Sequence, residues 1–387
     1  MSGANTADPS QYQVPVANQL LLETLHRLFT DTVTHEAVQA AEADGWAPTI
    51  WEPLAGTGAP WVGVPEAHGG SGGALVDAVG VLRLVGQYGV PLPVAETGLL
   101  GGWLAGHAGL ALPEGPLTVV PGRPDDQLSV VGDRLGGVAH RVPWAARSEL
   151  ILALLPVASG GSEIIAVDPS AAGVTIDVVR NLAGEPRETV RFDGVALTHR
   201  ASAPDGVTPA ALRQRGALAR AAQIAGALDR IAELTVEYAN QRTQFGQKIA
   251  RFQAVAQHLV RLVSEARLVG MALDGAVVAL TNASGRPDGG PGDATFEIAS
   301  LKALAGDSGS DAVARAHQVH GAIGMTQEYQ LHQLTRRVFS WREEFGTATQ
   351  WRREVGRVVA EVGADGIWPL ISQGSAARNA DRAPARS

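Results

Sequence analysis

The sequence predicts an α+β protein with an N-terminal α-helical domain, a central small β-barrel or β-sandwich, and a C-terminal four-helix bundle. Three observations support this order. Apolar residues recur at spacings of three and four from about residue 16 to residue 110, short β-rich runs fill residues 117–198, and long amphipathic stripes follow residue 209. The predicted boundaries are residues 1–115, 116–204 and 205–372, with residues 373–387 as a solvated tail.

Length and composition exclude several classes of function. The chain has 387 residues, of which 45% are hydrophobic, so it can fill the cores of two or three domains. A net charge of -8 provides no general attraction for nucleic acid or anionic lipid. The absence of cysteine excludes disulfides, Cys-ligated metals and a thiol nucleophile. Any redox chemistry therefore needs a bound organic cofactor.

The chain shows no targeting or membrane segment. Its first 19 residues are polar and lack a basic stretch followed by an apolar run. The longest weakly charged stretch, residues 97–113, is shorter than the roughly 20 apolar residues that span a bilayer. We expect a cytoplasmic protein. His317 and His320 are three residues apart on a predicted helix, but no further ligand pattern accompanies them, so no metal site is expected.

Each part has its own pattern. In the first, Leu21, Leu25 and Leu28 share a helical face, and a Gly- and Trp-rich passage at residues 51–61 interrupts the helices. Turn residues separate six runs with strand character. They are residues 117–120, 128–137, 149–157, 163–169, 174–179 and 188–197. Four apolar stripes predict the bundle helices, because each stripe needs a neighbouring helix to bury it. They cover residues 218–238, 255–271, 296–313 and a segment that begins at Leu331.

Two C-terminal blocks carry the strongest functional pattern. The first is RTQFGQKIARFQAVAQHL at residues 242–259, in which an arginine at a helix end precedes a Phe-Gly corner. The second is QVHGAIGMTQEYQL at residues 318–331, a Gly-rich turn with amide side chains. A guanidinium suits a diphosphate, and glycines allow a ligand to approach the backbone closely. A helix cap and a helix–helix turn would explain the same residues without a cofactor.

These blocks, together with residues 51–73 (WEPLAGTGAPWVGVPEAHGGSGG), resemble the acyl-CoA dehydrogenase family over nearly the whole chain. The resemblance implies an FAD held in extended form at a subunit interface, usually in a dimer of dimers. Arg242 would pair with the flavin diphosphate of a neighbouring subunit, Gln244 and Phe245 would line the cofactor, and Gln253 would contact its adenosine half. The other cofactor-binding residues that the resemblance implies are Gln318, His320, Gly321, Ala322, Gly324, Thr347 and Thr349.

Three departures from the family pattern concern the chemistry. The flavin and substrate loop T-E-P-x-A-G-S-D is replaced by VPGRPDDQ at residues 120–127, and the tryptophan that guards the flavin aligns near Arg141, with Trp144 as a possible substitute. The family's catalytic glutamate precedes Gly-Thr, where this chain has Phe345, and the base position that other members use on the first bundle helix corresponds to Gly216. Glu344 is thus the one candidate base.

Three functions fit this pattern. The chain could be an FAD-dependent acyl-CoA dehydrogenase, or a subunit that depends on a second family member for the base. Some bacterial members that resemble it form α2β2 heterotetramers acting on bulky thioesters in lipid metabolism, such as those of steroid degradation. A non-catalytic subunit, or a fold reused for non-redox biosynthetic chemistry, is the alternative. The resemblance also implies an acyl-CoA substrate and an electron acceptor such as an electron-transfer flavoprotein.

Overall fold

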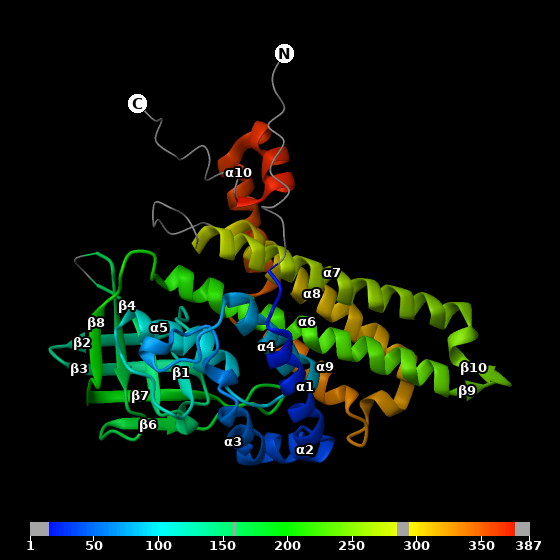
Figure 1. Ribbon diagram of the computed structural model, residues 1–387, viewed down its shortest axis with the longest axis horizontal. Coiled ribbons are helices and arrows are strands. Elements are labelled where there is room, and N and C mark those ends of the chain that lie inside the picture. Colours follow the sequence, from blue (N-terminus) through cyan, green and yellow to red (C-terminus); the bar gives the residue numbers. More distant parts are fainter. Residues whose placement is uncertain (1–14, 158–159, 285–293, 376–387) are drawn as a thin grey trace.

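The computed structural model describes residues 15–157, 160–284 and 294–375. The predicted order of helices, β structure and helices is confirmed (Figure 1). The β structure lies at one end of the molecule, and the long helices of the C-terminal part extend away from it. The predicted tail, residues 373–387, lies outside the described residues from residue 376 onwards.

The N-terminal part consists of short helices that cover one side of the bundle. Asn18 and Thr34 cap the first two helices through their side-chain oxygens, and Pro48 occupies the first turn of the third. The helices are α1 (Gln19–Thr32), α2 (His35–Asp44), α3 (Pro48–Gly56), α4 (Leu75–Tyr88) and α5 (Trp103–His107), with η2 (Ala59–Trp61), η3 (Glu66–His68) and the π-helical turn η4 (Glu96–Gly102) between them.

The central part is a sandwich of two four-stranded sheets, so the sandwich alternative is the correct one and the described strands form no closed barrel. The sheets have the orders β1-β4-β5-β8 and β2-β3-β7-β6, and apolar residues from both meet in one core. The strands are β1 (Leu117–Val119), β2 (Gln127–Val131), β3 (Arg134–Pro143), β4 (Leu150–Pro156), β5 (Ser162–Val167), β6 (Val174–Asp177), β7 (Arg187–Ala196) and β8 (His199–Ser202), with η5 (Ala145–Arg147) after β3.

Two details of the strand prediction were wrong. The run at residues 128–137 is not one strand, because a turn at Gly132 with positive φ folds it into the β2–β3 hairpin. The short strand β8 at the edge of its sheet was not expected, because its alternating half-buried and exposed residues give little apolar signal.

The C-terminal part contains the long helices α6 (Pro209–Gln241), α7 (Gln253–Ser284) and α8 (Thr295–His320). The segment that opens at Leu331 is divided, since α9 (Leu331–Trp341) ends at a turn and α10 (Ala348–Gln373) begins after it. The short elements β9 (Thr243–Gln244), β10 (Gln247–Lys248), η6 (Ile249–Arg251) and η7 (Gly321–Met325) connect the helices. A shared core joins these helices to α4, with Leu82, Ile224 and Val338 buried.

In the described part of the chain, we find no helix with the length and apolarity to cross a membrane.

Candidate functional site

A cleft of about 1010 Å³ lies where the sandwich meets the turn between α9 and α10. The loop after β1, the end of β3 and the segment before β7 form one wall, and the start of α6 and the α9–α10 turn form the other. Its lining residues include Arg123, Arg141, Arg180, Arg187, Arg213, Phe339, Glu343, Glu344, Phe345, Thr347, Gln350 and Arg353.

The ring of Phe345 fills the place where the family pattern would put a carboxylate. Phe345 is 9% exposed, and its φ of 54° lies in the left-handed region that is uncommon for a bulky residue. A Cβ atom added to Gly216 on α6 would lie only 2.2 Å from Cδ1 of this ring. The two base positions considered in the sequence therefore converge on one point in space. A phenyl ring occupies that point and cannot accept a proton.

Glu344, the predicted base, is held by two arginines. Arg187 donates from Nε to Oε1 over 2.7 Å, and Arg220 donates from Nε to Oε2 over 2.6 Å. Burial would raise the pKa of this carboxyl, but the two guanidinium charges and their hydrogen bonds outweigh it and lower the pKa to about 2. A carboxylate with so low a pKa and both oxygens engaged is a weak proton acceptor at neutral pH.

The backbone of the α9–α10 turn explains why Glu344 points toward these arginines. Residues 342–345 form a turn, so Glu344 and Phe345 are not successive residues of a helix. Lys302, fully buried on α8, donates to the backbone carbonyl of Arg342 over 2.7 Å and to that of Gly346 over 3.1 Å. Burial lowers the pKa of Lys302 to about 7. The hydrogen bonds from Lys302 hold this turn in place.

Buried charges extend away from the cleft. Arg220 also pairs with Glu96 of η4, and Arg187 pairs with Glu185 over 2.9 Å. The side chains of Glu96 and Glu185 are fully buried or nearly so. The sequence did not predict this network, because its charged residues come from four segments that lie far apart along the chain. These ion pairs hold the Glu344 side chain in place in its ionised form.

Arg141 and Trp144 have different surroundings. Arg141 has a φ of 55° at a register shift between β3 and β7, and it lines the cleft. Trp144 is buried, with the Arg187 guanidinium 4.6 Å from its ring centroid. Of these two, Arg141 is the residue that faces the cleft.

The predicted threonines lie at the start of α10. Thr347 caps the helix by accepting from the backbone N–H of Gln350 over 3.2 Å, and it lines the cleft. Thr349 is exposed and accepts a hydrogen bond from Arg352 over 3.2 Å.

The first C-terminal block forms a hairpin at the end of the bundle farthest from the sandwich (Figure 1). Arg242 follows the last residue of α6, and Phe245 and Gly246 form the two-residue turn between β9 and β10. Both turn residues have positive φ, as a tight hairpin of this type requires. The Phe245 side chain is 94% exposed.

The second block lies beside the first. Val319 of α8 packs with Ala239 and Ile249 in a small apolar cluster that joins the blocks. The ring of His320 stacks on Tyr238 with centroids 4.6 Å apart, and its Nδ1 lies 2.8 Å from the carbonyl oxygen of Ala316. His320 is thus buried inside the chain. Exposed residues of this end are Gln244, Gln253, Gln318, Gly321 and Ala322, whereas Gly324 is buried.

The predicted cofactor residues therefore form two groups. Arg242, the exposed amides and the Gly321 turn lie at the outer end of the bundle, and Thr347 and Thr349 lie at the cleft end. Among the described residues, no carboxylate forms an ion pair with Arg242. A free guanidinium, amide side chains and an exposed backbone turn are a suitable donor set for a diphosphate.

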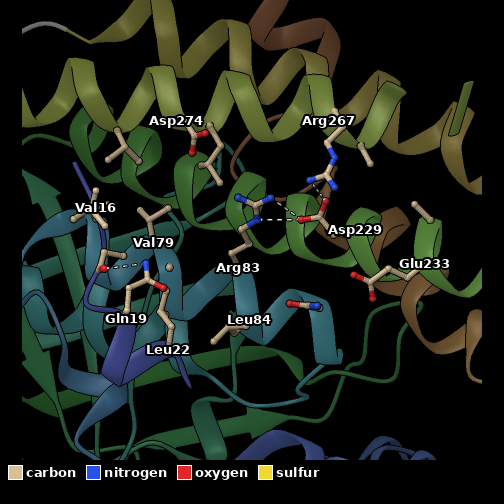
Figure 2. A pocket seen from close by; sticks show the side chains of 18 of the residues that line it. Val16, Gln19, Leu22, Val79, Arg83, Leu84, Asp229, Glu233, Arg267 and Asp274 are labelled. Carbon is tan, nitrogen blue, oxygen red and sulfur yellow. Dashed lines mark hydrogen bonds and ion pairs between the residues drawn. The ribbon is translucent and has the colours of Figure 1, made fainter. Parts of the chain in front are cut away.

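A second cavity of about 690 Å³ lies between α1, α4, α6 and α7. Figure 2 shows Arg83 bridging to Asp229, at 2.7 Å, with Arg267 on the other side of the same carboxylate. Its walls are mostly apolar, and burial raises the pKa of Asp274 inside it. The lining residues include none of the predicted site residues.

Comparisons with known proteins agree with this architecture. The model of the acyl-CoA dehydrogenase C-terminal domain matches residues 212–360. Acyl-CoA dehydrogenase IpdE2 of Mycobacterium tuberculosis is 30% identical over 328 residues, covering 82% of this chain and 89% of the relative. The ChsE4–ChsE5 complex of Mycobacterium tuberculosis has a chain with TM-score 0.81 and 22% identity, covering 91% of this chain and 100% of that one. The Tcur3481–Tcur3483 steroid ACAD G363A variant gives TM-score 0.77 at 25% identity, covering 89% and 97%.

Fold and relatives define an oxidoreductase of the flavoprotein class. The chain belongs to the acyl-CoA dehydrogenase family. This confirms the resemblance found in the sequence. FAD is the typical cofactor of the family.

Proposed function

We propose that this chain is one subunit of a heteromeric acyl-CoA dehydrogenase and that a second family member supplies the catalytic base and the flavin loop. The observation that carries the proposal is the contact between Phe345 and Gly216. It leaves neither base position able to hold a carboxylate, whereas Arg242 and the exposed amides that we propose for diphosphate binding are present. A chain that lost one half of the site and kept the other half is expected to work with a partner.

The proposed reaction is α,β-dehydrogenation of an acyl-CoA thioester. FAD, when bound, would accept the β-hydrogen as a hydride, while a carboxylate of the partner subunit removes the α-proton. In this scheme Arg242 neutralises the diphosphate, and Gln244, Phe245 and Gln253 border the cofactor. Gln318 and the exposed backbone at Gly321 and Ala322 would complete the cradle, with His320 and Gly324 shaping it from within.

The positions of the two groups favour action across an interface. The Arg242 end and the cleft lie at opposite ends of α6, a helix of 33 residues. At 1.5 Å per residue, such a helix is about 50 Å long. A single extended cofactor would have to cross that length to meet both groups in one chain. We infer that the Arg242 end serves a cofactor seated in a neighbouring subunit.

The substrate class and acceptor follow from the relatives by analogy. One structural relative is described as a steroid ACAD, which supports a bulky acyl-CoA for this chain as well. The structure of another neighbour is that of an electron transferring flavoprotein, and we propose an acceptor of that kind. The cytoplasm is the proposed compartment. Because the base is missing, the alternative is a purely structural subunit that takes no part in the reaction.

Co-purification tests the proposal. The chain is expressed alone and together with a family member that carries the E-G-T glutamate and the T-E-P loop. We expect little FAD in the chain alone, and a yellow complex that oxidises acyl-CoA with an artificial electron acceptor. Full turnover by the homomeric chain would refute the need for a partner. A complex whose FAD and turnover are the same without this chain would identify a structural subunit.

A further inference from the structure

We propose that the cavity between α1, α4, α6 and α7 binds an apolar molecule that carries one amine. The cavity has a volume of about 690 Å³, which lies within the range of small-molecule sites in proteins. None of its lining residues lines the cleft beside the α9–α10 turn. The inference therefore goes beyond the proposed function, which concerns a thioester and a flavin.

Apolar side chains from four helices form most of the wall of this cavity. Val79 of α4 and Leu273 of α7 are buried where the wall meets the core. Val16, just before α1, is 79% exposed although it lines the same cavity, so the cavity opens to solvent near this residue. The other apolar lining residues include Leu22, Val76, Leu84, Ala232, Val236 and Val277. Such a wall suits an alkyl or alicyclic body, because burial of apolar surface drives its binding.

One carboxylate on this wall has no partner. In Figure 2, the Asp274 side chain points from α7 into the cavity, toward Val79 of α4. Across the described ranges 15–157, 160–284 and 294–375, its carboxylate forms neither an ion pair nor a hydrogen bond. Burial raises the pKa of Asp274, because water cannot fully solvate its charged form. A half-buried carboxylate without a partner costs free energy, and a cation bound beside it would remove that cost.

The two arginines of the cavity are engaged by a different carboxylate. Arg83 donates to Oδ2 of Asp229 from Nε over 3.1 Å and from Nη2 over 2.7 Å. Nη1 of Arg267 lies 3.9 Å from Oδ1 of the same carboxylate. Two hydrogen bonds to Asp229 thus hold the Arg83 guanidinium away from Asp274. The charges of Arg83 and Asp229 shift the pKa of Asp274 in opposite directions, so this pair leaves the charge of Asp274 uncompensated.

The polar group of the ligand follows from the groups that surround it. Glu233, the third carboxylate of the lining, is 53% exposed and pairs with Arg230 over 3.3 Å, so it already has a cation beside it. An ionised Asp274 only accepts hydrogen bonds, and an ammonium group both donates them and neutralises the charge. A hydroxyl group would donate one bond and leave the charge in place. A carboxylate on the ligand would be repelled by Asp274.

Three probes with the same chain length and different polar groups test the inference. Decylamine, decanol and decanoate are titrated by calorimetry into the full chain at neutral pH, each below the concentration at which it forms micelles. We expect decylamine to bind about 10-fold more tightly than decanol, and decanoate to bind most weakly. Octylamine should bind about 10-fold more weakly than decylamine, because two fewer CH₂ groups are buried.

Two pairs of variants locate the binding site. Asp274→Asn should weaken decylamine binding about 10-fold or more and change decanol binding by less than about twofold. Asp31→Asn, at an exposed residue of α1 outside the lining, is its matched control. Val263→Trp should weaken both probes about 10-fold, because the larger side chain fills the cavity from a lining position that is 37% exposed. Val260→Trp, at a 68% exposed position of α7 outside the lining, should weaken neither.

Several outcomes would overturn the inference. Equal affinity for decylamine and decanol would remove the case for an amine, as would an Asp274→Asn variant that binds decylamine like the wild type. Amine binding that neither Asp274→Asn nor Val263→Trp changes would reflect the net charge of -8 and not this cavity. Displacement of decylamine by an acyl-CoA would assign the binding to the substrate cleft. These readouts use neither flavin content nor turnover of a complex, so failure of this inference is distinguishable from failure of the proposed function.

Discussion

Arg220 donates from Nε to Oε2 of Glu344 over 2.6 Å, in a contact where the arginine is 1% exposed and the glutamate 19% exposed. The carboxylate of Glu344 stabilises the fold through this ion pair, and the ion pair would have to break for Glu344 to remove a proton. To act as a base, Glu344 would have to leave a buried guanidinium with one counterion fewer. In the sequence, Glu344 was a candidate because it lies next to the base position. The contact with Arg220 adds that its carboxylate is already engaged and is not free to accept a proton.

Glu344→Gln should leave turnover of the heteromeric complex within about twofold, because the partner's carboxylate removes the proton under the proposed function. The variant should nevertheless lower the free energy of unfolding of the isolated chain by about 3 kcal/mol, since Arg187 and Arg220 lose a buried counterion. Urea denaturation and steady-state assays measure the two effects. Glu343→Gln, the exposed neighbour, is the control for both. A loss of turnover of 100-fold or more in the Glu344 variant alone would restore Glu344 as the base.

The stability difference between wild type and Glu344→Gln should shrink in acid. The folded pKa of about 2 lies below the ordinary value of 4.5, so the contribution of the ionised carboxylate is present above pH 4.5 and is lost as the pH falls toward 2. Between pH 5 and pH 3 the difference should fall by about 2 kcal/mol. Denaturation of both proteins at each pH measures it. A difference independent of pH over this interval would contradict the ion pairs with Arg187 and Arg220.

Arg242→Ala should weaken retention of FAD by the heteromeric complex about 10- to 100-fold, because a charge-assisted bond to the diphosphate is lost. Flavin per complex after gel filtration, and the dissociation constant from flavin fluorescence, provide the readouts. Arg251→Ala removes a nearby exposed cation of η6 and should retain the flavin. Undiminished flavin in the Arg242 variant would rule out the proposed diphosphate contact.

Gly216→Ala should destabilise the chain by about 1–3 kcal/mol, although alanine favours a helix, because its Cβ would overlap the Phe345 ring. In a Phe345→Ala background the same change should stabilise by up to about 1 kcal/mol. The sign reversal is measured in a double-mutant cycle by urea denaturation. Gly356→Ala on α10 is the control, since an added Cβ there meets nothing within 4 Å. Stabilisation by Gly216→Ala in the wild-type background would disprove the contact.

Periodic apolar patterns predicted most of the fold. The stripes of α6, α7 and α8 are long enough that one helical face is unambiguous in the sequence. Prediction failed where structure depends on a turn or an edge. The β2–β3 hairpin depends on positive φ at Gly132, and β8 depends on pairing with β5, which lies more than 30 residues earlier.

The candidate site was only partly predictable. Departures at Phe345 and Gly216 were visible in the sequence, but their contact depends on how α6 packs against the α9–α10 turn. The turn that holds Glu344 was not predicted; the left-handed φ of Phe345 and the hydrogen bonds from Lys302 shape it. The arginines of the cleft were not predicted as a group, because they come from the sandwich, α6 and α10.

The packing of Phe345 against Gly216 also bears on how such a chain can change over generations. A glutamate introduced at position 216 would collide with the ring, and one introduced at position 345 would inherit a left-handed backbone beside Arg220. Recovering a base at position 216 therefore requires two substitutions, and the intermediate that only removes the ring leaves a cavity in the core. Reversion at position 216 by a single mutation is therefore blocked. Under the proposed function, a lineage that has reached this arrangement is expected to keep its dependence on a partner subunit encoded by a second gene.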